Sequence, residues 1–210
     1  MAADDTATGH VGDDDQHMAN VFAVHSVGNS IATYLRNSYP STLAGLEMPD
    51  CAFDLVSSGE LTGEPGDATR ITLYLYRITV NEHSRQAAAG TTARSTPIGL
   101  DLHFLMTAWA GNARDEHAML AWAIRQLHMF PILDASSLSP EAGWGANEVI
   151  QIIPAELPTE DIMRIWDALD PAYRLSVSYI ARLVRLDPDT PAVGRPVVAT
   201  RFAYGEEVRA

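Results

Sequence analysis

The chain has 210 residues, 47% of them hydrophobic, which is enough for one domain with a core of its own. Its net charge is −13, so neither nucleic acid nor an anionic membrane surface is an expected partner. No stretch approaches the roughly 20 apolar residues of a membrane-spanning helix. The polar N-terminus lacks the pattern of a secretory signal, so we expect synthesis and assembly in the cytoplasm.

Residues 1–17 are an acidic leader without arginine or lysine, and we predict a flexible N-terminal tail because no apolar periodicity runs through them. The leader contains five aspartates: Asp4, Asp5, Asp13, Asp14 and Asp15. Residues 18–187 carry the periodic patterns of a folded α+β domain. Residues 188–210 contain several prolines and glycines, and we predict an extended C-terminal arm there.

A helix is predicted over residues 21–38, because apolar side chains recur at spacings of three and four before Tyr39 and Pro40 end the pattern. These side chains are Val24, Val27, Ile31 and Leu35. A short strand is predicted over residues 51–56. The single cysteine, Cys51, lies in this apolar run and is predicted to be a buried, unreactive thiol rather than a nucleophile.

Residues 59–67 are predicted to be a turn-rich loop, and residues 71–80 are the strongest predicted strand because β-branched and aromatic side chains alternate there. The polar residues 81–97 follow as another loop. If the protein is a small enzyme or a ligand-binding domain, this loop is where its pocket is expected, with Glu82, His83 and Arg85 as the polar groups.

The most informative segment is residues 98–134, where a strand with a period of two is followed directly by a helix. The strand has one face with Leu100, Leu102, Phe104, Met106 and Ala108, and another with Asp101, His103, Leu105, Thr107 and Trp109. Asn112 is a favourable N-cap, Asp115 and Glu116 suit the first turn, and Pro131 ends the helix. The stripe of this helix, recurring at spacings of three and four, is His117, Leu120, Ile124 and Leu127, with His117 either packed or at the surface.

The rest of the chain is predicted to contain a loop over 135–147, a strand over 148–153, a helix with Thr159 as N-cap and a long strand over 173–186. The helix is expected to bury Ile162, Ile165, Trp166 and Leu169; the long strand is expected to place Leu175, Val177, Tyr179, Ala181 and Leu183 on one face. Residues 197–202 could form a last short strand. Together the elements predict a single α+β domain with a mainly antiparallel or mixed sheet packed by helices.

No catalytic or metal site is predicted. The chain has no Gly-x-Ser-x-Gly elbow, no phosphate-binding loop and no paired-histidine motif. His117 and His128 are eleven residues apart on one predicted helix. They therefore lie about 16 Å apart along its axis and cannot share a metal ion. We expect no catalytic residue, no cofactor and no metal ligand.

Two features point to contacts with other chains. Trp144 lies between two glycines in a loop, where a large aromatic side chain can anchor a partner. The arm suits addition to the sheet edge of another subunit through Val197, Val198, Phe202 and Tyr204, although a free terminus fits the sequence equally well. A loose acidic series is either solvated or contacts a basic partner surface; it comprises Glu141, Glu148, Glu156, Glu160 and Asp161.

Four segments, in order and in register, resemble the cap proteins of extracellular contractile injection systems, the phage tail-like particles of the antifeeding-prophage and virulence-cassette type. The segments are LYLYR (73–77), LDLHFLMTAWA (100–110), AWAIRQLHMFPILD (121–134) and YRLSVSYIARLVRLD (173–187). The resemblance covers about residues 20–187 and implies a fold like that of phage tail-terminator proteins.

The resemblance also implies a structural, non-enzymatic role. Such caps form a homohexameric ring at the end of the particle distal to the baseplate, where they contact the inner tube protein and the sheath protein, fix the length and anchor the sheath. A baseplate or sheath-adaptor protein of the same particle is the alternative, and a small ligand-binding domain or enzyme is a third reading.

Overall fold

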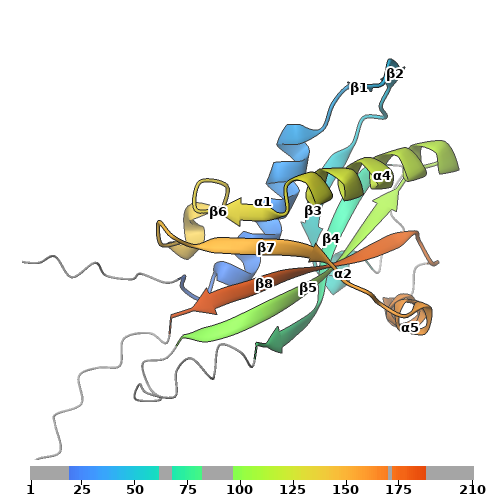
Figure 1. Cartoon of the computed structure of the whole chain (residues 1–210). Coiled ribbons are helices and arrows are strands. Elements are labelled where there is room, and N and C mark those ends of the chain that lie inside the picture. Colours follow the sequence, from blue (N-terminus) through green and yellow to red (C-terminus); the bar gives the residue numbers. More distant parts are fainter. Residues whose placement is uncertain (1–18, 62–67, 82–96, 170–171, 188–210) are drawn as a thin grey trace, which may run out of the picture.

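The computed structural model describes residues 19–61, 68–81, 97–169 and 172–187, which form a six-stranded sheet with helices on both faces (Figure 1). The strands are β3 (Ala52–Val56), β4 (Arg70–Val80), β5 (Ile98–Trp109), β6 (Ile132–Asp134), β7 (Val149–Pro154) and β8 (Ser176–Leu186). Their order is β3-β4-β5-β8-β7-β6, with β3 and β4 parallel and the other neighbours antiparallel. The predicted α+β fold with a mixed sheet is confirmed.

Two long helices, α1 (Ala23–Ser38) and α4 (Ala113–Met129), pack on one face of this sheet, which we call the inner face. The helix α5 (Thr159–Leu169) packs at one end of the opposite face, the outer face (Figure 1). The shorter elements are the hairpin strands β1 (Thr42–Leu43) and β2 (Leu46–Glu47), the helical turn α2 (Ser58–Leu61) and the 3-10 turn η1 (Pro140–Ala142).

The strand β5 is buried on both faces, as its alternating pattern predicts. All five side chains expected on its first face belong to the main core, which lies between the inner face and the two long helices. On the other face, Leu105 and Trp109 belong to a second core beneath α5. One strand therefore supplies side chains to both hydrophobic layers of the domain.

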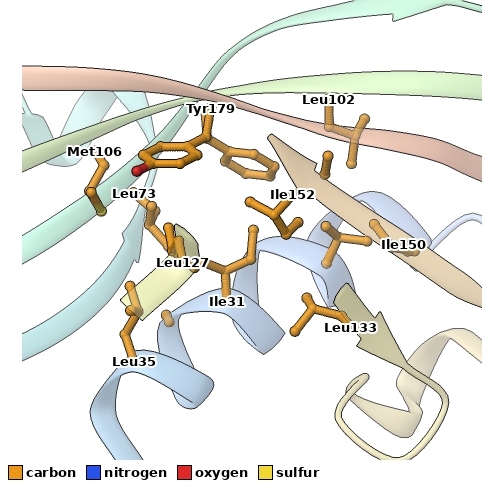
Figure 2. Close-up of a cluster of buried hydrophobic side chains, with 14 of the residues drawn as sticks. Ile31, Leu35, Leu73, Leu102, Met106, Leu127, Leu133, Ile150, Ile152 and Tyr179 are labelled. Carbon is orange, nitrogen blue, oxygen red and sulfur yellow. The ribbon is translucent and has the colours of Figure 1, made fainter. Parts of the chain in front are cut away.

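The main core joins distant parts of the sequence (Figure 2). Ile31 and Leu35 project from α1 toward the sheet, and Leu127 reaches it from α4. Met106 and Tyr179 meet them from β5 and β8, and none of these five side chains is more than 2% exposed. Each such burial stabilises the fold by about 1.5–3 kcal/mol.

The second core depends on a pair of tryptophans. The rings of Trp109 and Trp166 make an edge-to-face contact with centroids 5.9 Å apart. The indole nitrogen of Trp109 donates a hydrogen bond to Oγ1 of Thr72 at 2.8 Å, so its polar atom is satisfied inside the sheet. The stripe predicted for α5 is confirmed, since Trp166 and Leu169 are buried and Ile162 and Ile165 pack against the same core.

The predicted stripe of α4 is wrong at Ile124. His117 is exposed and Ile124 is 36% exposed, whereas Met119, Trp122 and Ala123 are buried beside Leu120 and Leu127. The helix is rotated from the predicted orientation, because burying the large indole of Trp122 and the side chain of Met119 removes more apolar surface from water than burying an imidazole. The N-cap is confirmed, since the side chain of Asn112 accepts a hydrogen bond from the backbone N–H of Asp115 at 3.0 Å.

Several element boundaries also differ from prediction. The loop predicted over 59–67 begins within α2, and the short strand β6 and the hairpin β1–β2 were not predicted. Thr159 is the first residue of α5 rather than its N-cap, because the backbone N–H groups of Asp161 and Ile162 already bond to the carbonyl of Pro158. These elements are short, and their pairing partners lie elsewhere in the chain or in a tight turn.

Two aliphatic residues of α4, Leu127 and Ile124, give a direct test of which face of this helix is buried. Replacing the buried Leu127 with alanine should lower the free energy of unfolding by about 2–5 kcal/mol, because the cavity cannot refill. Replacing the exposed Ile124 with alanine should lower it by no more than about 1 kcal/mol. Urea unfolding of both variants measures the difference, and equal losses would contradict the burial described for α4.

Candidate functional site

The described residues contain no group of three or more His, Cys, Asp or Glu side chains arranged to hold a metal ion. In the same part of the chain, none of the helices is both long and apolar enough to cross a membrane.

Cys51 is half-buried, and burial is the main cause that raises the pKa of its thiol to about 12. The thiolate that a nucleophile needs is therefore disfavoured, which agrees with the predicted unreactive role. The candidate sites described next are surfaces.

A β-bulge shapes the part of the outer face that lies away from α5. Leu100 pairs with Val184 and Leu102 pairs with Ala181, so two β8 residues, Arg182 and Leu183, oppose the single β5 residue between the paired positions. Leu183 has a φ of 62°, in the left-handed region that a leucine rarely adopts. The alternation predicted for 173–186 is therefore wrong at its last position: Leu183 is 40% exposed and Val184 is buried in its place.

The carboxylate of Asp101 holds this bulge in place. One of its oxygens accepts the backbone N–H of Leu183 at 3.2 Å, and the side-chain amide of Asn81 donates to both oxygens at 3.1 Å. The guanidinium of Arg182 lies 3.8 Å from the same carboxylate, whose side chain is only 13% exposed. A mostly buried acid thus connects the end of β4, the beginning of β5 and the bulge of β8.

A shallow groove of about 560 Å³ lies over the bulge. It is lined by Asn81, Ile132, Val149, Gln151, Arg182 and Leu183. Three of these side chains are apolar and still 56%, 52% and 40% exposed (Ile132, Val149 and Leu183). We call this feature the bulge groove.

The charges that face solvent around the bulge groove are mainly positive. The side chain of Arg182 is 47% exposed, and Arg185 on the same strand is exposed as well. The acids behind them are covered: Asp101 is mostly buried, and burial of Glu148 raises the pKa of its carboxyl against the opposing effect of Arg185. The exposed acid Asp134 lies on the edge strand β6, where Ser136 and Ser137 donate hydrogen bonds to its carboxylate and lower its pKa.

A second groove of about 470 Å³ separates the β1–β2 hairpin from α4. Its helix side consists of two alanines and Trp122 between two arginines, Arg114 and Arg125. Its hairpin side includes Leu46, which is 63% exposed. This groove lies at the C-terminal end of α1, whereas the chain enters the described domain at the other end of that helix.

The strand β4 has a half-free edge. β3 pairs with it only between Arg70 and Tyr74, and within the described residues no strand pairs with that edge from Leu75 to Val80. Ile78 and Val80 are 47% and 51% exposed on this stretch. An exposed edge with apolar side chains is a template for strand addition.

The residues predicted to make contacts fall into two groups. Trp144 is half-buried against the main core, and its indole nitrogen donates a hydrogen bond to Oγ of Ser26 at 2.8 Å, so its own chain fixes the ring orientation. The arm residues Val197, Val198, Phe202 and Tyr204 lie outside the described residues, as do Glu82, His83 and Arg85 of the loop considered for a ligand.

The predicted acidic series does not form one patch among the described residues. Glu141 lies 2.7 Å from Nδ1 of His25, Glu148 is buried, and Glu160 pairs with Arg164 within α5.

The bulge groove was not predicted from the sequence, because the bulge reverses the strand alternation at Leu183, whose position in that alternation otherwise predicts a core residue. The only sequence signal was the pair of adjacent residues Arg182 and Leu183 near the end of a long strand.

Comparison with known proteins identifies the domain. The family model described as the Pvc16 N-terminal domain matches residues 26–200. The chain belongs to this family. The resemblance to injection-system caps drawn from the four segments is thereby confirmed, while the comparison with curated proteins gave no match.

Two solved structures share the fold. One is the PVC sheath/tube terminator of an extracellular contractile injection system in its extended state, with 16% identity, a TM-score of 0.52, and coverage of 91% of this chain and 65% of that one. The other is the tube terminating cap of the anti-feeding prophage, with 13% identity, a TM-score of 0.50, and coverage of 88% and 58%. The chain thus spans less than two thirds of the length of either structure.

The strained leucine of the bulge gives a prediction about stability. Leu183→Asn should raise the free energy of unfolding by about 1 kcal/mol, because asparagine tolerates the left-handed region better than leucine does. Val149→Asn is the matched control, since Val149 is also an exposed apolar strand residue but has no positive φ. Thermal unfolding compares the two variants, and a loss of stability in both would mean that Leu183 stabilises the isolated fold.

Proposed function

We propose that this chain is a structural cap that terminates the inner tube and the sheath of a contractile injection system at the end distal to the baseplate. The observation that carries the proposal is the family match over residues 26–200, together with a fold shared with two terminators. In this role the protein fixes particle length and anchors the sheath, and its surfaces bind other proteins rather than a substrate. Its partners are further copies of itself, the inner tube protein and the sheath protein.

The described surfaces support a ring of identical subunits, which we infer to be a homohexamer assembled in the cytoplasm before the particle is released. A closed ring needs two different surfaces on each subunit, because each copy contacts its neighbours head to tail. The half-free edge of β4 and the groove beside α4 lie on different parts of the domain and satisfy this requirement. The domain is residues 18–187, and the arm of residues 188–210 reaches the next copy.

Deleting the gene in the producing strain tests the function. If the protein is the cap, electron microscopy should find particles with uncontrolled length or with sheath detached from the tube, and the intact gene should restore uniform particles. Labelling the protein should mark the end opposite to the baseplate. A label at the baseplate end would instead assign it to the baseplate or a sheath adaptor, and normal particles after deletion would remove it from the particle.

The arm is tested separately with Phe202→Ala and Tyr204→Ala. If these side chains pack on a neighbouring subunit, the double variant should weaken ring formation at least tenfold, about 1.4 kcal/mol, while the subunit still folds. Native mass spectrometry measures the ring, and circular dichroism measures the fold. Ala203→Ser, in the same arm, is the control, and rings that form as well with the double variant as with the control would contradict the role of the arm.

A further inference from the structure

The bulge groove is an unusual surface for a chain with a net charge of −13. Its apolar side chains Ile132, Val149 and Leu183 are each at least 40% exposed. Leu183 is unfavourable in two ways, because it exposes apolar surface and holds a left-handed backbone conformation. The hydrogen bond to Asp101 accounts for the backbone conformation, whereas three apolar side chains exposed together on this face indicate a surface that another segment can cover.

The chain itself enters the described domain beside this groove. Ala19 forms a parallel bridge with Leu186, and its carbonyl accepts the backbone N–H of Asp187 at 2.9 Å. Leu186 pairs with β5 on its other side, so Ala19 lies on the side of β8 that faces β7. β7 leaves β8 after the pair Gln151–Arg182, so Ala19 lies beyond the point where the two strands separate.

The distances allow the residues before Ala19 to cover the groove. Leu183 is three residues before Leu186 on β8, roughly 10 Å at the rise of a strand. Asp13, Asp14 and Asp15 are four to six residues before Ala19, and an extended chain of this length reaches roughly 13–20 Å. By contrast, the groove beside α4 lies at the far end of α1, a helix of 16 residues that is roughly 24 Å long.

The chemistry of this segment matches the groove. Residues 11–17 read VGDDDQH, which places one apolar side chain next to three carboxylates. The groove offers an apolar floor beside the exposed guanidinium of Arg182, with Arg185 three residues further along β8. Carboxylates close to guanidinium groups form charge-assisted hydrogen bonds, and those bonds are weaker in high salt.

We propose that residues 11–17 of the acidic leader bind in the bulge groove of the same chain. Asp13, Asp14 and Asp15 face Arg182 and Arg185, and Val11 covers the apolar floor. The leader is thus a ligand of the domain and shields Leu183 in the unassembled subunit. This binding is independent of the cap function, because it takes place within one isolated chain.

Disulfide trapping in the purified full-length chain tests the proposal. The only native cysteine is removed with Cys51→Ala, and Asp14→Cys is combined with Val149→Cys in the groove or, as the control, with Glu141→Cys, which lies beside Asn20 and so within reach of the leader but outside the groove. Val149 is 52% exposed and the side chain of Glu141 is 37% exposed, so both targets are accessible. Under mild oxidation the groove pair should close within one chain at least about tenfold faster than the control pair.

Two further variants distinguish binding from folding. The double substitution Arg182→Gln and Arg185→Gln should slow disulfide formation by the groove pair several-fold. Leu183→Asn, made separately, should slow it to a similar extent, and this variant should not lower the melting temperature. Peptide mapping by mass spectrometry identifies the bonded cysteines. Equal closure rates for groove and control pairs would overturn the proposal, and so would closure unaffected by all of these substitutions. A disulfide between two chains would also overturn it, because the occupant would then be the leader of a second copy.

Discussion

The burial of β5 on both faces is the constraint on which the rest of the structure depends. A strand between two hydrophobic layers must carry large apolar side chains on both of its faces, and its polar side chains must form hydrogen bonds within the sheet. Thr107 does so with Oγ of Ser176 at 2.8 Å, and His103 with Oγ1 of Thr79 at 3.1 Å. The two long helices and α5 then attach to opposite sides of one strand, which makes the domain a single cooperative unit.

Asp101 shows what this constraint does to a charge. Its carboxylate lies within a strand whose neighbours are covered, so it needs several hydrogen-bond donors to replace water. Two of these come from Asn81 and one from the backbone of Leu183, and the last is available because β8 bulges at that point. The irregular strand, the strained leucine and the exposed groove can therefore be traced to one buried acid.

The sequence was sufficient to predict the features that repeat regularly along the chain. The alternation of β5, the stripe of α5 and the N-cap at Asn112 follow from local periodicity, and each was confirmed. The rotation of α4 could not be predicted, because it depends on whether Trp122 or Ile124 finds room against a distant part of the chain. The bulge at Leu183 is equally non-local, since it requires the carboxylate of Asp101, 82 residues away in the sequence.

The contact surfaces were the least predictable part, because the exposure of a side chain depends on which distant elements of the chain cover it. No pattern around Ile132, Val149 or Leu183 differs from that of a buried strand residue; they are exposed because the core beneath α5 does not extend to this end of the outer face. Trp144 shows the reverse case: its loop position suggested an exposed anchor, yet its indole is tied to Ser26 of α1.

The position of β8 has a mechanical consequence. It pairs with β5 on one side and with β7 on the other, and both pairings are antiparallel. A pull applied to the chain beyond Leu186 therefore acts along the strand axis, and many backbone hydrogen bonds resist it together in shear instead of opening one after another. A load on the C-terminal end is thus transmitted directly into the middle of the sheet, where the side chains that β8 buries in the main core oppose the sliding of the strand.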